Sequence, residues 1–224
     1  MSSTQPQIAI RKSQTHRATL LWNIGRTLFR ILTSRYCDLK VYHSHHIPSS
    51  GGVLLVCNHQ SYLDPILLGV QITRPMSYLA RHTLFRNPIF SWLIRNVNAF
   101  PVRRGEGDVG AVKEALRRLE DGHMLAMFPE GTRTTSGEMK SLEPGIALVI
   151  RRARDLTVIP AVINGSFRAW PKGKKLPQSH PIRLMYGPPL DFAGLRPAQI
   201  VSKLEETLRQ MLTDLRSGNI ARYK

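Results

Sequence analysis

Cysteine and long apolar runs are scarce in this 224-residue chain, and each scarcity excludes a class of protein. The two cysteines, Cys37 and Cys57, are too few for a disulfide framework and supply no ligand set for zinc, so we expect no metal site. No apolar run reaches the roughly 20 residues that a helix needs to cross a bilayer. Residues 1–17 are polar and basic, and the apolar stretch after them is too interrupted for a secretory signal. We therefore expect the chain to stay on the cytoplasmic side of a membrane, as a peripheral or monotopic protein.

Acidic residues are also scarce: 15 aspartates and glutamates face 32 lysines and arginines, which gives a formal net charge of +17. Such a charge implies an anionic partner, either lipid headgroups or nucleic acid. Aromatic residues form only 7% of the chain and are not interleaved with the basic ones, as a base-stacking surface would require. We therefore expect an anionic membrane surface as partner and no nucleic acid. A basic membrane- or nucleic-acid-binding module without activity is the alternative from another class.

Residues 18–36 are the best candidate for a membrane-contacting segment, because apolar residues recur there at helical spacing. Two arginines four positions apart interrupt the apolar span, so this amphipathic helix should lie in the interface rather than cross it. Its tryptophan is a residue type common at lipid interfaces. The alternative is a helix packed on the protein core. The expected membrane-binding residues are Leu21, Trp22, Ile24, Arg26, Leu28 and Arg30.

A histidine and an aspartate five positions apart follow the apolar run at 52–57, which is typical of a buried strand. In a continuous helix, residues five apart point about 140° away from each other, so His59 and Asp64 can meet only across a turn. Pro65 favours the first helical position, which predicts a strand, a turn and a helix with Asp64 as its N-cap. The pair then suits a general base and its orienting carboxylate. The alternative is that Asp64 only caps the helix.

Two further apolar segments, at 99–104 and 128–133, each end in a turn that delivers an arginine, as phosphate-binding strand ends do. Taken alone, either arginine is better explained as a surface charge. Four segments in this order resemble the four sequence blocks of the glycerolipid acyltransferase family: 58–64, 99–104, 128–133 and 158–162. Its familiar members are the 1-acylglycerol-3-phosphate acyltransferases. The resemblance runs from about residue 34 to residue 187.

The first and third blocks match closely. Phe-Pro-Glu-Gly-Thr-Arg of the family stands unchanged at 128–133, and Asn-His-x-Ser-x-x-Asp stands at 58–64. Besides the histidine and aspartate, the matched positions that we expect to be structural are Asn58, Ser61, Pro129 and Pro160.

Two positions depart from the family pattern. The second block is met at Val102 and Arg104, but Asn98 stands where a glycine is usual. Asparagine is the next best residue for a positive φ, so we expect the turn to survive. Glu143 precedes the Pro-Gly pair at 144–145, where the family often carries a lysine. That departure concerns contacts with the acceptor and not the chemistry.

The resemblance implies an O-acyltransferase that moves a fatty acyl group from a thioester donor to the free hydroxyl of 1-acylglycerol 3-phosphate. The product would be phosphatidate, in phospholipid biosynthesis. An acceptor hydroxyl is a weak nucleophile, and imidazole, with a reference pKa of about 6.5, is a suitable base. His59 would take the proton while Asp64 holds the tautomer and stabilises the imidazolium. No enzyme nucleophile is required: the chain has no Gly-x-Ser-x-Gly elbow, and we expect Cys57 to be a buried thiol.

The substrate-binding residues implied by the resemblance are Arg104, Glu130, Gly131, Thr132 and Arg133. The arginine fork matches phosphate oxygens, so Arg104 and Arg133 would hold the acceptor phosphate. Glu130 either accepts from a second acceptor hydroxyl or anchors Arg133. The Gly131 turn lets the backbone approach the ligand closely.

Several substrate properties stay open. The donor is acyl-CoA or acyl carrier protein, and no cofactor beyond it is expected. Alternative acceptors are glycerol 3-phosphate, another lysophospholipid and an amine-containing lysolipid. The sequence makes no prediction of oligomeric state.

Alternating strand and helix patterns predict one α/β domain with a largely parallel sheet flanked by helices. We expect a polar basic tail at 1–17, the amphipathic helix at 18–36 and an acyltransferase domain at 37–224. Ligands gather at strand ends in such sheets, and His59, Arg104 and Glu130 all fall there. The expected strands are 52–57, 75–79, 124–128, 158–163 and 182–186, and the expected helices are 89–96, 109–120 with Asp108 as its cap, 145–154 and 197–215.

Overall fold

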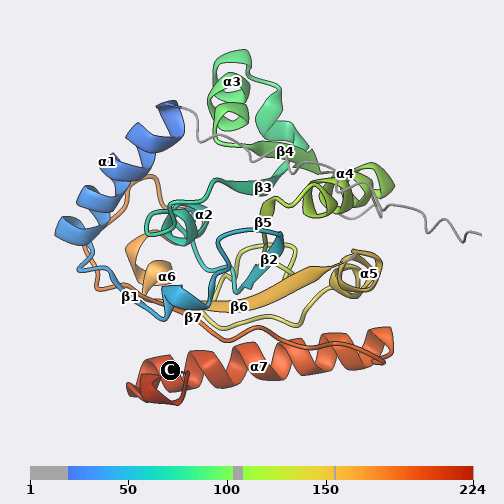
Figure 1. Ribbon diagram of the computed structural model, residues 1–224. Coiled ribbons are helices and arrows are strands. Elements are labelled where there is room, and N and C mark those ends of the chain that lie inside the picture. Colours follow the sequence, from blue (N-terminus) through green and yellow to red (C-terminus); the bar gives the residue numbers. More distant parts are fainter. Residues whose placement is uncertain (1–19, 103–107, 154, 224) are drawn as a thin grey trace, which may run out of the picture.

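The apolar run at 52–57 forms the central strand of the sheet, β2 (Gly52–Cys57), in the computed structural model, which describes residues 20–102, 108–153 and 155–223 (Figure 1). The sheet runs in the order β1-β7-β6-β2-β5-β3-β4. The other strands are β1 (Lys40–Tyr42), β3 (Met76–Arg81), β4 (Ala99–Val102), β5 (Met124–Met127), β6 (Leu156–Asn164) and β7 (Arg183–Tyr186). Every neighbouring pair is parallel except β6 and β7. The expected largely parallel α/β fold is confirmed.

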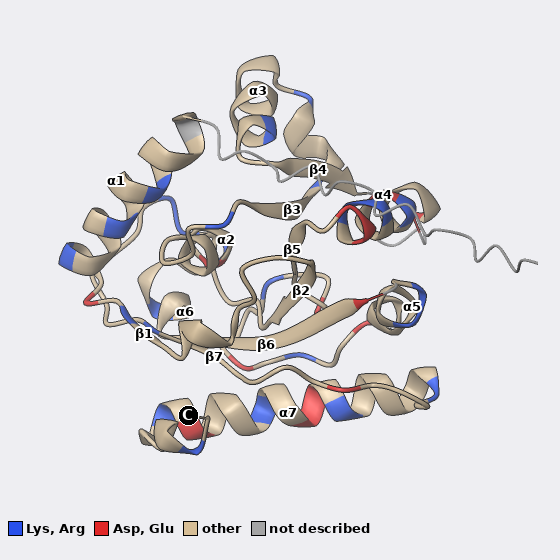
Figure 2. Cartoon of the chain, viewed as in Figure 1, with Lys and Arg blue, Asp and Glu red and all other residues tan. Residues whose placement is uncertain are grey.

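Helices cover both faces of this sheet (Figure 1). They are α1 (Leu20–Tyr36), α2 (Asp64–Gly69), α3 (Pro88–Asn96), α4 (Val109–Glu120), α5 (Gly145–Arg152), α6 (Ser166–Ala169) and α7 (Pro197–Ser217), with short 3-10 turns η1 (Ser44–His46), η2 (His82–Phe85) and η3 (Ile220–Tyr223). Asp108 caps α4 as expected, since its Oδ1 accepts from the backbone N–H of Ala111 at 3.0 Å. Charged residues are spread over these helices, with lysine and arginine outnumbering acidic residues (Figure 2).

Successive residues of β2 pack into two separate hydrophobic cores, one on each face of the sheet. Leu54 and Val56 pack with α4, α5 and α7 on one face, while Val53 and Leu55 pack with α1 and α2 on the other. All six residues of β2 are buried, which explains why its sequence is uniformly apolar rather than alternating. At Gly52 a Cβ would lie 2.4 Å from the carbonyl oxygen of Leu119, so only glycine allows α4 to end this close to the strand.

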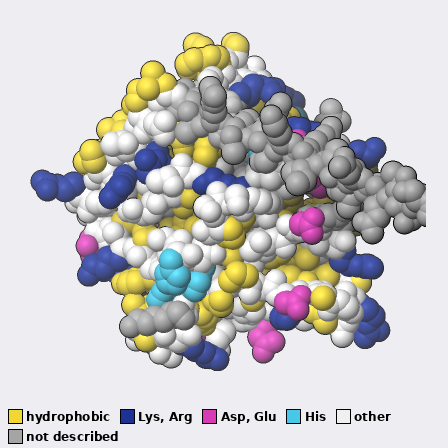
Figure 3. Space-filling view, in the orientation of Figure 1, with side chains coloured by type: hydrophobic (Ala, Val, Ile, Leu, Met, Phe, Trp, Pro, Cys, Tyr) yellow, Lys and Arg dark blue, Asp and Glu magenta, His cyan; other side chains and the backbone are white. Residues whose placement is uncertain are grey.

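Helix α1 packs one face on the core and exposes another. Ile24, Leu28 and Ile31 are 55%, 53% and 57% exposed, and hydrophobic side chains follow α1 along the left edge of the molecule (Figure 3). Trp22 needs a correction: it is only 5% exposed and packs in the core, with its ring 6.4 Å from that of Tyr78. It therefore does not belong to the solvent-facing side of the helix. The side chain of Leu21 lies outside the described residues.

The described helices include none that combines the length and the apolar character needed to cross a bilayer.

Candidate active site

His59 and Asp64 meet across the turn that joins β2 to α2. The Nδ1 of His59 lies 2.9 Å from Oδ2 of Asp64, and both side chains are buried. An ionised carboxylate only accepts hydrogen bonds, so Nδ1 carries the hydrogen and Nε2 keeps its lone pair. Such an arrangement can serve as a general base with its orienting group.

Asp64 fixes this turn rather than capping the helix. Helix α2 begins at Asp64 itself, so the expected N-cap role needs correction. Its Oδ2 accepts from the backbone N–H groups of Gln60 at 2.6 Å and Ser61 at 2.7 Å, in addition to His59. Three donors converging on one oxygen lock the carboxylate, and through it the imidazole.

The third block supports His59 from the other side. The His59 ring stacks on Phe128, with centroids 4.1 Å apart and planes 20° apart. The backbone N–H of Thr134 donates to the carbonyl of His59 at 3.0 Å. His59 is therefore positioned both by its own turn and by a segment about 70 residues further along the sequence.

Glu130 also links this block to His59. Its Oε1 accepts from the backbone N–H of His59 at 2.6 Å, and its Oε2 accepts from that of Lys140 at 2.8 Å. The residue is 3% exposed. Burial raises the pKa of the carboxyl, while the hydrogen bonds from Lys140 and His59 act in the opposite direction. Because both oxygens face backbone donors, the carboxylate form fits the site, and in the described part of the chain no ion pair joins Glu130 to Arg133.

The expected structural residues tie the turn to its neighbours. Asn58 spans to β6, where its Nδ2 donates to the carbonyl of Ile163 at 3.0 Å and its Oδ1 accepts from the Ile163 N–H at 2.8 Å. The Ser61 hydroxyl donates to the carbonyl of Trp170 at 2.7 Å and accepts from the Leu63 N–H at 3.1 Å.

The two motif prolines accept through their carbonyls. Pro129 accepts from the N–H of Glu143 at 2.7 Å, and Pro160 from the N–H of Gly187 at 2.8 Å.

The guanidinium of Arg133 lies over the ring of Tyr62, a residue of the turn between β2 and α2. Its Cζ lies 3.5 Å from the centroid of the Tyr62 ring, and that ring contacts Trp170 at 5.3 Å. Among the described residues no carboxylate pairs with Arg133. The ring covers one face of the guanidinium, and the N–H groups on its edge are available to an anion. Arg104, the other expected phosphate ligand, lies outside the described residues.

The Gly131 turn sits against Glu143. Gly131 has φ 67°, and a Cβ there would lie 3.3 Å from Cγ of Glu143. Both the positive φ and the close neighbour call for glycine. Thr132, next in the chain, is half-buried. Glu143 itself is exposed, so its carboxylate is available beside the motif.

The second block begins at a left-handed turn. Asn98 has φ 63°, which confirms that the turn survives with asparagine in place of the usual glycine. Arg118 of α4 donates to the Asn98 carbonyl at 3.1 Å and to the Ser77 hydroxyl at 2.9 Å. Glu114 accepts from that arginine at 2.7 Å, and the hydrogen bonds of Arg117 and Arg118 lower the pKa of Glu114 to about 2.

Cys57 is fully buried. Burial raises the pKa of its thiol well above the usual value, and the nearby charges of Asp64 and Glu130 add to that. The thiol therefore stays protonated, as expected for a core residue rather than a nucleophile.

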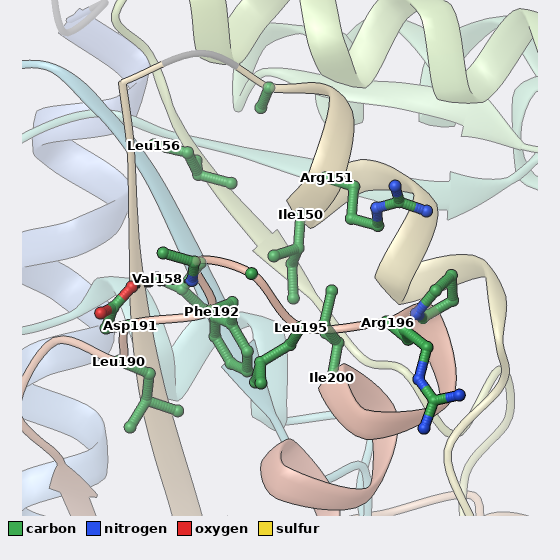
Figure 4. Close-up of a pocket in the computed structure, with 14 residues that line it drawn as sticks. Ile150, Arg151, Leu156, Val158, Leu190, Asp191, Phe192, Leu195, Arg196 and Ile200 are labelled. Atoms are coloured by element: carbon green, nitrogen blue, oxygen red, sulfur yellow. Dashed lines mark hydrogen bonds between the residues drawn. The ribbon is translucent and has the colours of Figure 1, made fainter.

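A cavity of about 510 Å³ lies elsewhere, between the end of α5 and the start of α7 (Figure 4). Leu156 and Val158 line it from the first residues of β6, whereas Asn58 bonds to Ile163 at the far end of that strand. The cavity is therefore separate from the His59 site.

Comparison with known proteins agrees with this geometry. The family model described as acyltransferase matches residues 38–164. The 1-acyl-sn-glycerol-3-phosphate acyltransferase of Bacillus subtilis (strain 168) is 30% identical over 190 residues, covering 83% of this chain and 92% of that protein. The lyso-ornithine lipid O-acyltransferase of Pseudomonas aeruginosa is 34% identical over 107 residues, covering 43% of this chain and 40% of that protein. The crystal structure of the 1-acyl-sn-glycerophosphate acyltransferase from Thermotoga maritima superposes with a TM-score of 0.74 at 26% identity, covering 87% of this chain and 79% of that one.

Proposed function

This chain belongs to the acyltransferase family and is an O-acyltransferase, and on that premise we propose that its acceptor is 1-acylglycerol 3-phosphate and its product phosphatidate. The acyl donor is a thioester, either acyl-CoA or acyl carrier protein. The observation that carries the proposal is the buried pair of His59 and Asp64, with Nδ1 bound to the carboxylate and Nε2 left as a base. Two relatives named for this activity, one of them a solved structure, support the choice of acceptor.

In the proposed reaction, Nε2 of His59 takes the proton of the acceptor hydroxyl as its oxygen attacks the thioester carbonyl carbon. Asp64 stabilises the imidazolium that results. The carbon–sulfur bond then breaks, and the imidazolium returns the proton to the departing thiolate. One acyl group moves from sulfur to oxygen, and one thiol is released for each ester formed.

Acceptor binding would use the edge of Arg133. The N–H groups on that edge suit a phosphate monoester, and the ring of Tyr62 covers one face of the guanidinium. Arg104 stays a predicted second phosphate ligand. We assign Gly131 and Thr132 to the turn that approaches the acceptor, and Glu130 to positioning His59 through its backbone.

Membrane attachment would use the exposed face of α1. Ile24, Leu28 and Ile31 are each more than half exposed, and Arg30 is exposed on the same helix. A helix of this kind lies in the headgroup region with its apolar side toward the acyl chains. Such a location, on the cytoplasmic side, would bring the enzyme to a lysolipid acceptor.

Glu143 favours a second candidate acceptor, a lysolipid that carries an amine. Its exposed carboxylate lies beside the Gly131 turn, where it would attract an ammonium group and repel a phosphate dianion. One relative is named for a lyso-ornithine lipid.

The two candidates are separated by product analysis with purified enzyme and a panel of acceptors: lysophosphatidate, glycerol 3-phosphate and lyso-ornithine lipid. Selective formation of phosphatidate supports the main proposal. Selective acylation of the amine-bearing acceptor, together with a shift toward lysophosphatidate in Glu143→Lys, overturns it in favour of the second.

A further inference from the structure

Helix α3 and the turn η2 before it expose an unusual amount of apolar surface. None of the residues of α3 is buried, and Ile89 and Trp92 are 79% and 61% exposed. A helix on a globular protein normally turns its apolar stripe to the core. Contiguous exposed apolar surface of this kind marks an interaction site. The other exposed apolar side chains here are Leu84, Phe90 and Leu93.

The exposed apolar side chains of α3 and α1 are seen on the same face of the molecule in one view (Figure 3). Hydrophobic side chains gather at the top of the molecule over α3 and continue down its upper left edge along α1 (Figures 1 and 3). We refer to these together as the two-helix surface. It comprises Leu20, Ile24, Leu28, Ile31, Ile89, Phe90, Trp92 and Leu93.

The charged residues of the chain segment that carries the two-helix surface are almost all positive. From residue 20 to residue 100 the acidic residues are Asp38 and Asp64; Asp64 is buried at the active site, and Asp38 pairs with Arg183 at 2.8 Å. Arginines lie on both helices, while neither carries an acidic residue (Figure 2). An apolar surface on helices that carry arginine and no acidic residue matches anionic lipid headgroups. It matches a second copy of itself poorly, because a symmetric dimer would bring like charges together.

The tryptophan of this surface is on α3. Trp22 of α1 is buried, whereas Trp92 points to solvent. Tryptophan is enriched at membrane–water interfaces, where its ring is apolar and its N–H remains hydrated. At nine residues, α3 is roughly 14 Å long, which suits a helix lying in the interface and not one crossing the bilayer.

We propose that α3 is a second membrane contact and that an anionic bilayer docks across α3 and α1 together. The inference rests on the proposed function only in placing the enzyme at a lipid surface. Its tests measure binding and not turnover, so the enzyme can fail to acylate lysophosphatidate and still satisfy them.

The first test is flotation of the full chain with vesicles of phosphatidylglycerol and phosphatidylcholine. Leu93→Ser is compared with Leu148→Ser, since these leucines are 42% and 40% exposed on α3 and α5. We expect Leu93→Ser to weaken vesicle binding roughly tenfold, from the loss of one buried leucine side chain. Leu148→Ser should bind like wild type. Equal binding by the two variants, or an equal loss in both, overturns the proposal.

The second test reads tryptophan fluorescence and compares wild type with the conservative variant Trp92→Phe. Brominated lipids in the vesicles should quench tryptophan fluorescence, and Trp92→Phe should remove most of that quenching. Quenching that is unchanged in Trp92→Phe would come from Trp22 or Trp170 and would overturn the proposal. Sedimentation without vesicles completes the set: a dimer that Leu93→Ser dissociates would assign this surface to a second copy of the chain, and a monomer supports the bilayer.

Discussion

Replacing Glu130 by Gln separates a positioning role from a substrate-binding role. Both oxygens of Glu130 accept from backbone N–H groups, at 2.6 Å and 2.8 Å, in a site that is 3% exposed. Glutamine keeps one acceptor oxygen, which loses its charge, and turns an NH₂ group toward the other donor. The first change costs about 1 kcal/mol, and the unsatisfied donor costs about 1–3 kcal/mol, so we expect the free energy of unfolding to fall by roughly 2–4 kcal/mol.

The kinetic effect of Glu130→Gln should appear in kcat. If about half of this free-energy loss reflects poorer placement of His59 and appears as a higher activation barrier, kcat falls roughly 5- to 30-fold. KM for the acceptor should change less than about twofold. Urea unfolding and steady-state kinetics measure the two quantities. Glu138→Gln is the matched control, because Glu138 is exposed in the same loop, and it should change stability by less than about 0.5 kcal/mol. A large rise in KM with unchanged stability would refute the reasoning and return Glu130 to the acceptor.

Three further predictions concern binding, stability and reactivity. Arg133→Ala should raise KM for a phosphate acceptor about tenfold or more, and Tyr62→Leu, but not Tyr62→Phe, should raise it about two- to fivefold; equal effects on an uncharged acceptor would count against a phosphate role. The pKa of Glu114 is lowered to about 2, so its contribution to stability is complete above its unfolded value near 4.5 and is lost as pH falls toward 2. Glu114→Gln should therefore destabilise the protein by about 1 kcal/mol at pH 7, after allowance for solvent screening, and by almost nothing near pH 2; a pH-independent difference in urea unfolding would contradict this. Cys57 should resist iodoacetamide in the native protein and react once it is unfolded, as followed by peptide mass mapping, because burial raises its pKa and blocks access; rapid native labelling would reopen its exclusion as a nucleophile.

Local backbone chemistry explains what the sequence predicted well. The strand, turn and helix around His59 follow from an apolar run and a proline, and the positive φ of Asn98 follows from the backbone freedom of asparagine. The cap at Asp108 is equally local. Each of these features depends on a few consecutive residues.

Features set by distant packing could not be predicted in the same way. Helical spacing gives the angle between side chains, but α1 has apolar residues on more than one side, so only the sheet decides that Trp22 turns inward and Ile24 outward. The acceptor of the His59 N–H is Glu130, 71 residues away, and no pattern in either block signals a bond between a side chain and a backbone N–H. The exposed apolar face of α3 could not be predicted either. An apolar helix is expected to be buried, and only the packing of the rest of the domain shows that this one is not.

The most direct test of the central claim follows thiol release and phosphatidate formation together, with lysophosphatidate as acceptor and acyl-CoA or acyl carrier protein as donor. Wild type should release one thiol for each phosphatidate formed, and His59→Ala should lose turnover while keeping the circular dichroism spectrum of the wild type. Turnover retained in a folded His59→Ala variant would contradict the account by removing His59 as the base.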